Sequence, residues 1–285
     1  MSDQASLRSY LYVPGSEFRM IEKALVSQAD ALVLDLEDAV APSRKSAARS
    51  QVAQVLASTH EKPIFVRVNA VTSAFALQDI EEIASPHLAG LRLPKTESPD
   101  AIRTVVEQLE RLNCSASLHC IIESALGIER AFTIASAHPR IAGIGLGEAD
   151  LMADLGVSDE SGLAFARSRI VVAARAARLP NPVKSVYTNI RDLEGLRTST
   201  ILGKRMGFFG RSAIHPAQLA IINEVFTPTQ VELDEAQTLL SRLERAVDTG
   251  TGAFALENGG FVDQAVVESA RRTLALAHRS SNPAM

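Results

Sequence analysis

Short apolar runs alternate with longer segments of helical periodicity along almost the whole chain, and this alternation constrains the fold more than any other feature. Several of the helical segments open at Ser or Asp, the residues favoured at helix N-caps. Eight strand-then-helix units predict an α/β fold, a closed (βα)8 TIM barrel, for which 285 residues suffice. The eight strand candidates are residues 10–13, 31–35, 64–68, 90–94, 118–123, 142–147, 184–187 and 208–215.

A doubly wound open sheet is the alternative architecture, because its strands would be equally apolar. Two features favour the barrel. No glycine fingerprint follows the first apolar run, and polar residues follow nearly every run instead of gathering at one switch point. We therefore expect a barrel domain over residues 1–226 and a C-terminal helical extension over residues 227–285. A connector with four glycines, TGTGAFALENGGF, separates the two helical patterns of the extension, which suggests that it acts as a lid.

Composition excludes several classes of protein. The net charge of -4 provides no positive field for a nucleic acid. No apolar stretch approaches the length of a membrane span, and the N-terminus lacks the apolar core of a signal peptide. Cys114 and Cys120 have neither a CxxC spacing nor a His partner at metal-ligand spacing, so we expect structural thiols in a cytoplasmic protein without membrane contact.

Charged residues gather where the apolar runs end, which in a barrel is the edge that carries the active site. Glu123 and Asp150 follow neighbouring strands, so their carboxylates can converge on one hard cation such as Mg²⁺. A salt bridge from Glu123 to a neighbouring Arg is the alternative, and spacing alone does not decide between them. The other charged or polar residues at these ends are Arg19, Asp35, Glu37, Asp38, Arg67, Asn69, Lys95, Glu148 and His215.

Arg67 lies in the strand text FVRVN, where a guanidinium can hold a substrate carboxylate with two parallel hydrogen bonds. It can also pair with the acidic residues Asp35, Glu37 and Asp38, and both roles are compatible. We expect these three carboxylates to orient Arg67 and metal-bound water rather than to react themselves.

Residues near the last strand candidate suggest two further roles. Gly207, Gly210 and Arg211 lie where barrels commonly bind phosphate. His215 precedes Pro216, a sequence more typical of a helix start than of a catalytic base. No Ser/His/Asp motif, Walker loop or dinucleotide fingerprint is found in the sequence.

The motifs, taken in order, resemble the citrate lyase β-subunit family within the HpcH/HpaI aldolases. The resemblance runs from about Ser9 to Leu276 and includes Asp79 after FVRVN. It rests on YVPGSEFRMIEKA, DALVLDLEDAVAPSRKSAAR, FVRVN, GLRLPKTES, IIESALG, GIGLGEADLMADLG, GFFGRSAIHPAQ and GAFALENGGFVDQAVVESARR.

This resemblance implies a (βα)8 barrel that cleaves a β-hydroxyacyl-CoA thioester, such as citryl-, malyl- or citramalyl-CoA, into acetyl-CoA and an α-keto acid. It implies Mg²⁺, with Mn²⁺ as an alternative, bound by Glu123 and Asp150, and a substrate-binding role for Arg67. The family's catalytic aspartate matches Asp263, which in trimeric members reaches the neighbouring subunit's site. A homo-oligomer, trimer or hexamer, is therefore expected.

The resemblance also implies coenzyme A contacts around the first loop and the IHP segment, at Arg19, Lys45, Ile214 and His215. Three positions depart from the family pattern. Lys184 stands where many members have an aspartate, Ala265 replaces a frequent proline, and Ser124 replaces the usual threonine.

Three other functions remain open from the sequence. One is a CoA-independent class II aldolase acting on a free hydroxy-keto acid, against which the tail with Asp263 argues. Another is a lyase-complex subunit whose acyl group is carried by an acyl-carrier protein. The third is a non-catalytic subunit, which the intact Glu123, Asp150 and Arg67 disfavour. The identity of the keto acid, among oxaloacetate, glyoxylate and pyruvate, is undecided.

Overall fold

The structure is a computed structural model that describes residues 7–248, 254–255, 261–262 and 264–280. Contacts divide the chain into two compact units, one spanning Leu7–Asn223 and the other beginning at Glu224. In the described part of the chain, no helix is long and apolar enough to cross a membrane. The expected domains, 1–226 and 227–285, stay a prediction.

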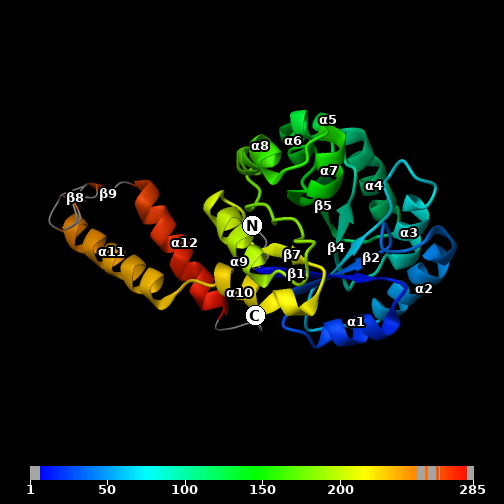
Figure 1. Cartoon of the computed structure of the whole chain (residues 1–285), viewed down its shortest axis with the longest axis horizontal. Helices are drawn as coiled ribbons and strands as arrows, with labels where there is room; N and C mark the ends of the chain where they lie inside the picture. The colour runs from blue at the N-terminus through cyan, green and yellow to red at the C-terminus, as the bar shows by residue number, and fades with distance from the viewer. Residues whose placement is uncertain (1–6, 249–253, 256–260, 263, 281–285) are drawn as a thin grey trace. The chain divides into compact units, whose positions relative to one another are not determined.

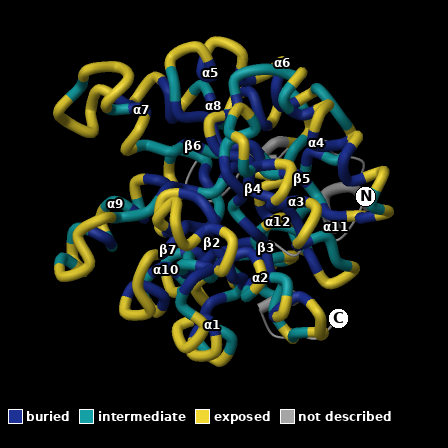
Figure 2. The backbone as a smooth tube through the Cα atoms, turned by 90° about the vertical axis from the view of Figure 1, so that its right-hand side faces the viewer, coloured by how far each residue is buried: buried dark blue, intermediate teal, exposed yellow. Residues whose placement is uncertain are grey.

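The first unit is built around a parallel sheet whose strands follow in the order β6-β5-β4-β3-β2-β1-β7. Strands such as β2 are buried on both faces, which explains why their sequences are nearly uninterrupted runs of apolar residues. Figure 2 shows the strands mostly buried and the outer helices with exposed faces. The seven strands are β1 Ser9–Pro14, β2 Ala31–Asp35, β3 Ile64–Arg67, β4 Leu88–Leu93, β5 Ser117–Ile122, β6 Ile141–Leu146 and β7 Arg211–Ala213.

Helices cover the outside of this curled sheet (Figure 1). The Ser98 and Ser124 hydroxyls accept from backbone N–H groups in the first turns of α4 and α5, and the Asp192 carboxylate does the same for α9, as the sequence predicts for N-caps. The helices are α1 Phe18–Leu25, α2 Lys45–Val55, α3 Ala76–Ile83, α4 Pro99–Arg111, α5 Ala125–Glu129, α6 Ala131–Ala135, α7 Glu148–Leu155, α8 Ala164–Ala176, α9 Leu193–Arg205 and α10 Leu219–Phe226, with short 3-10 turns η1 Pro42–Arg44, η2 Glu160–Leu163 and η3 Pro216–Gln218.

The α/β class with a parallel sheet is confirmed, but the predicted strand at residues 184–187 is wrong. This segment makes one isolated bridge, from Lys184 to Arg211 of β7. Pro180 and Pro182 precede it and have no N–H to donate to a ladder. The carbonyl of the preceding Val183 lies near Gly145 of β6, yet the described residues contain no bridge there. The sheet of the described chain therefore has seven strands rather than the eight of a closed barrel.

The last strand candidate, 208–215, is shortened to the three residues of β7. Gly210, just before β7, has a φ of +78°, and a Cβ there would collide with the Leu7 carbonyl oxygen. Only glycine can be accommodated at such a short distance from the Leu7 carbonyl. The backbone therefore turns at a position where the apolar sequence predicts an extended strand.

The second unit contains the two helices predicted from the C-terminal patterns, α11 Gln230–Asp248 and α12 Gln264–Ser280, which pack against each other. A short antiparallel pair, β8 Phe254–Ala255 with β9 Phe261–Val262, lies between them in the chain. The role of this extension as a lid stays a prediction.

Candidate active site

A cavity of about 560 Å³ opens at the carboxyl ends of the strands. Every strand of the large sheet contributes at least one residue to its lining, including Arg67 on β3 and Arg92 on β4. In parallel α/β proteins this edge is where ligands bind, because the loops that follow the strands converge on it.

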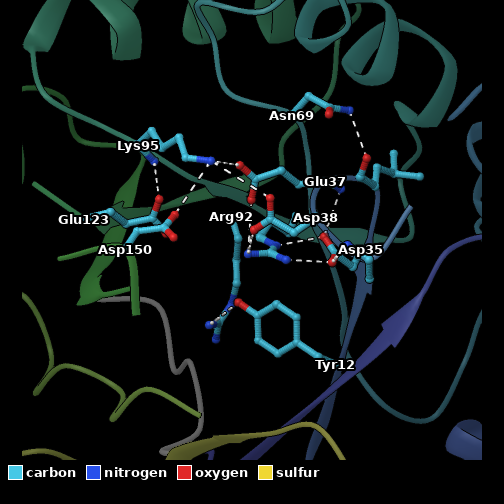
Figure 3. Close-up of polar contacts among 12 residues, drawn as sticks. Tyr12, Asp35, Glu37, Asp38, Asn69, Arg92, Lys95, Glu123 and Asp150 are labelled. Atoms are coloured by element: carbon cyan, nitrogen blue, oxygen red, sulfur yellow. Dashed lines mark hydrogen bonds and ion pairs between the residues drawn. The ribbon is translucent and has the colours of Figure 1, made fainter. Parts of the chain in front are cut away.

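Five carboxylates, which we call the acidic cluster, meet at this edge. Each lies at or shortly after a strand end, as the sequence predicts for a polar site. Only two cationic side chains, Arg67 and Lys95, form ion pairs with them in the described part of the chain. The members of the acidic cluster are Asp35, Glu37, Asp38, Glu123 and Asp150 (Figure 3).

Arg67 at the end of β3 is held by three of these carboxylates. Its Nε and Nη2 donate to the two oxygens of Asp35 at 2.7 and 2.6 Å. Its Nη1 lies 3.1 Å from Glu37 Oε2 and 3.4 Å from Asp38 Oδ2. Burial is the largest influence and would lower the pKa of Arg67, but the hydrogen bonds to Asp35 and the attraction of nearby groups, Asp35 first, together raise the pKa. The guanidinium is thus permanently charged and rigidly oriented.

Lys95 connects the two halves of the acidic cluster. It has a φ of +51°, a left-handed conformation that costs a residue with a side chain of the order of 1 kcal/mol. In this conformation its backbone N–H donates to Glu123 Oε2 at 3.2 Å, while its Nζ donates to Glu37 at 3.0 Å and lies 3.7 Å from Asp150. The ammonium therefore occupies a position among carboxylates that a cation favours (Figure 3).

Glu123 follows β5 directly and is only 7% exposed. Gly147 leaves room for it, because a Cβ at that position would collide with the Glu123 carboxylate. Burial, followed by repulsion from Glu37 and Asp150, raises the pKa of Glu123 to about 8. Such a carboxylate is stabilised by a cation, and Mg²⁺ suits an all-oxygen pair of Glu123 and Asp150. The residues thus fit the ion.

Protein ligands alone do not complete a metal shell here. Among the described residues, no group of three or more His, Cys, Asp or Glu side chains is arranged to hold a metal ion. Two carboxylates leave positions for water and substrate, which is the arrangement that catalytic Mg²⁺ sites favour.

The four residues expected to contact coenzyme A are placed differently from one another. Ile214 lines the cavity, and Arg19 is exposed on α1. The buried Lys45 donates from Nζ to the Leu36 and Glu37 carbonyls at 2.8 and 2.9 Å, so its ammonium is already satisfied. His215 accepts from the Ala217 N–H at 3.2 Å and caps η3, in agreement with a helix start.

The glycines near β7 form a turn. Gly207 has a φ of +96°, and Gly210 makes the close approach described above. The buried Arg211 donates to Ser199 and Thr200 of α9 at 3.1 and 2.9 Å. Within the described residues these contacts pack β7 against α9, and the phosphate-binding role stays a prediction.

A second charged group, which we call the balanced cluster, lies beside the cavity and consists of Glu148, Glu160, Arg167 and Lys184. Arg167 bonds Glu148 at 2.6 Å and Glu160 at 2.9 Å, and Lys184 bonds Glu148 at 2.7 Å. Burial would raise the pKa of Glu148, but the bonds from Arg167 and Lys184 prevail and lower it to about 2. Lys184, a departure from the family pattern, is thus an internal counter-ion.

Both cysteines, Cys114 and Cys120, are free and buried, as expected for structural thiols. Burial raises the pKa of the Cys120 thiol to about 12, which keeps it protonated. Asp263, the aspartate that the family resemblance makes catalytic, lies outside the described residues.

The sequence reasoning missed several cavity residues, among them Tyr12, Arg92, His119 and Ser212. Only Arg92 left a signal in the sequence, because a charged residue inside the apolar run GLRLP must face either solvent or a site. Tyr12, His119 and Ser212 occur in segments with ordinary strand sequences, so no feature of the sequence distinguishes them as site residues.

The family model for HpcH/HpaI aldolase/citrate lyase matches residues 8–216. The chain belongs to this family. It is an enzyme of the lyase class that the family comprises, and the resemblance seen in its motifs is confirmed. The match covers all of the strands of the large sheet, and the positions of Glu123 and Asp150 lie within it.

Two kinds of relative are similar over nearly the full chain. Citrate lyase subunit beta of Escherichia coli is 35% identical, covering 96% of this chain and 94% of that protein. A (3S)-malyl-CoA thioesterase of Cereibacter sphaeroides is 36% identical, covering 97% of both. Among solved structures, the protein CitE of Mycobacterium tuberculosis in complex with magnesium, acetoacetate and coenzyme A matches with a TM-score of 0.82 at 28% identity, covering 97% of this chain and 100% of that one.

Proposed function

We propose that this protein is a Mg²⁺-dependent carbon–carbon lyase that cleaves, or in reverse forms, a β-hydroxyacyl-CoA thioester. The products of cleavage are acetyl-CoA, or a related acyl-CoA, and an α-keto acid. Support comes from the solved relative that holds magnesium, acetoacetate and coenzyme A, and from the citrate lyase subunits that match along nearly the whole chain.

Glu123 and Asp150 would hold the magnesium ion, with Mn²⁺ as an alternative. When bound, the ion lowers the pKa of a coordinated hydroxyl and polarises an adjacent carbonyl. The carboxylate excess of the acidic cluster is the observation that carries this proposal, because five carboxylates face only Arg67 and Lys95 in the described part of the chain. One divalent cation would restore much of the charge balance.

The reaction breaks the carbon–carbon bond between the hydroxyl-bearing carbon and the carbon next to the thioester. The hydroxyl loses its proton, its electron pair forms the ketone, and the released thioester enolate takes up a proton to give acyl-CoA. Arg67, held in place by Asp35, would neutralise the carboxylate beside the nascent ketone. Asp263 is proposed as the acid/base for the hydroxyl or enol proton, on the family resemblance alone.

The proposal is tested in the condensation direction. The full chain with Mg²⁺ is incubated with acetyl-CoA or propionyl-CoA and with oxaloacetate, glyoxylate or pyruvate, and the condensed thioester is sought by mass. A condensed thioester that requires both Mg²⁺ and one of these keto acids is the expected result. Its absence from every combination, with protein shown to be folded, would overturn the lyase assignment.

Thioester hydrolysis is a second candidate, because relatives 36% identical to this chain carry the name (3S)-malyl-CoA thioesterase. The two activities leave different products from the same substrate. A lyase releases acetyl-CoA and glyoxylate from malyl-CoA, whereas a thioesterase releases malate and free coenzyme A. Chromatography of both product pairs, together with a thiol reagent for free coenzyme A, separates them. A carrier-protein thioester would be a further substrate to offer in the same assay.

We further propose that the enzyme is a homo-oligomer, trimer or hexamer, in which Asp263 serves a neighbouring subunit, as the family resemblance implies. Asp263→Asn and Glu123→Gln would then each be nearly inactive alone, whereas co-expressed chains would regain part of the activity. Recovery arises because some sites combine an intact Glu123 with an intact Asp263. No recovery in verified mixed oligomers would assign Asp263 to its own chain.

A further inference from the structure

Arg92 on β4 is a cation inside the fold that the proposed reaction does not yet use. The strand register pairs it with Arg67 on β3 and with His119 on β5, so the three side chains belong to neighbouring strands at one level. Arg92 is only 6% exposed, yet it lines the cavity. Figure 3 shows its side chain directed away from the acidic cluster and towards the Tyr12 hydroxyl.

The partners of Arg92 differ in kind from those of Arg67. Its Nη1 donates to the Tyr12 hydroxyl at 3.3 Å and to Ser212 Oγ at 3.4 Å, both long hydrogen bonds to neutral groups. Its Cζ lies 4.5 Å from the Tyr10 ring centroid. Its Nε is buried without a hydrogen bond, and no ion pair to a carboxylate is found for Arg92 among the described residues.

A buried guanidinium without an anion is costly. Three cation–π contacts, to Tyr10, Tyr12 and Phe65, offset part of the cost of desolvating Arg92, but none of them supplies a negative charge. Nearby charge does not compensate either, because Asp35 and Glu37 are bound to Arg67. An anionic ligand in the cavity would supply the missing counter-ion.

The surroundings of Arg92 favour a carboxylate over a cation or a neutral group. The hydroxyls of Tyr12 and Ser212 can each donate to an anion that reaches the guanidinium. His119 is partly buried and lines the cavity, and burial, followed by repulsion from Arg92, lowers its pKa to about 3, so it adds no second positive charge. One carboxylate would therefore suffice to balance this end of the cavity.

We propose that Arg92, Tyr12 and Ser212 form an anion subsite that binds a second carboxylate of the substrate. The proposal rests on the proposed function, in which Arg67 and the metal take the carboxylate beside the ketone. The guanidinium carbons of Arg67 and Arg92 lie 5.3 and 5.6 Å from the centroid of the same Tyr12 ring, and both residues line the one cavity that would hold the substrate. The substrate class is a hydroxyacyl thioester that yields a dicarboxylic keto acid.

The test compares a dicarboxylic with a monocarboxylic probe. Oxaloacetate and pyruvate are titrated calorimetrically into the full chain with Mg²⁺, first with the wild type and then with Arg92→Met, which keeps the length of the side chain without its charge. Arg92→Met should weaken oxaloacetate binding about 10- to 100-fold, the equivalent of losing a charged hydrogen-bonded pair, and change pyruvate binding less than about threefold.

Two further variants keep the test decisive if Arg92→Met does not fold. Arg92→Lys retains the charge but not the planar fork and should lose part of the oxaloacetate preference. Tyr12→Phe keeps the ring and removes one donor, so it should weaken oxaloacetate by a few-fold. Arg103→Met on the exposed face of α4 is the matched control and should leave both probes unchanged.

Equal weakening of both probes, or no weakening of either, would overturn the subsite and leave Arg92 as a packing cation. The outcome is independent of catalysis, because binding is measured. A protein that discriminates between the probes but forms no condensed thioester would refute the proposed lyase while the subsite stands. A lyase that binds oxaloacetate no better than pyruvate would refute only the subsite.

Discussion

The acidic cluster and the balanced cluster lie along the same cavity but differ in how their charge is compensated. In the balanced cluster two carboxylates meet two cations, and each of Arg167 and Lys184 is bonded to Glu148. In the acidic cluster five carboxylates meet Arg67 and Lys95. The pKa values of the two clusters therefore shift in opposite directions: that of Glu148 falls to about 2, and that of Glu123 rises to about 8. The balanced cluster stabilises the fold by itself, whereas the acidic cluster is suited to receive a cation.

The largest effect is expected when the acidic cluster loses a metal carboxylate. Glu123→Gln and Asp150→Asn should each reduce turnover about 1,000-fold or more, because a bound ion contributes several kcal/mol to transition-state stabilisation. Calorimetric Mg²⁺ titration should show the affinity lost in parallel. Asp100→Asn, on the exposed face of α4, is the control. Full activity of the wild type in excess EDTA would refute the metal site.

Removing Glu148 should destabilise the protein by about 3 kcal/mol, because it leaves Lys184 and Arg167 buried without their main anion. Urea unfolding of Glu148→Gln measures this. Glu123→Gln, compared in EDTA, should be no less stable than the wild type, since it relieves repulsion inside the acidic cluster. Equal destabilisation by the two variants would show that the clusters do not differ in the way described.

Arg67→Lys should raise the KM for the keto acid about 10- to 100-fold and leave the KM for acyl-CoA unchanged, because an ammonium cannot replace the planar fork. Steady-state kinetics in the condensation direction measure both constants. An unchanged keto-acid KM would restrict Arg67 to holding Asp35 and Glu37 together.

The smallest effect concerns acid stability near Arg92. The folded-state pKa of His119 is about 3, below the value of about 6.5 expected in the unfolded chain, so the unfolded state binds more protons in mild acid. Stability contributed by neutral His119 is present above pH 6.5 and is lost as the pH falls below it, by about 2 kcal/mol between pH 7 and pH 5. His119→Asn should flatten this dependence in urea unfolding. An identical slope in both proteins would contradict the assignment.

Much of the site could be predicted from strand ends. The apolar runs end at or shortly before Arg67, Glu123 and Asp150, which marks these residues as site candidates, and the structure brings them to one cavity. The predicted strand at residues 184–187 is wrong because local β-propensity does not reveal whether a neighbouring strand provides partners for its backbone hydrogen bonds. Prolines before the segment were the available signal.

The sequence by itself determined the α/β class, the order of the elements and the edge on which polar residues gather, because periodicity and strand ends are local properties. Only the tertiary structure decided how the charges are shared. Arg67 and Arg92 have similar sequence contexts, because each is an arginine in an otherwise apolar strand. Contacts between segments far apart in the chain bind the first to Asp35 and leave the second facing neutral hydroxyls, since electrostatic pairing depends on distances across strands that spacing along one strand does not contain.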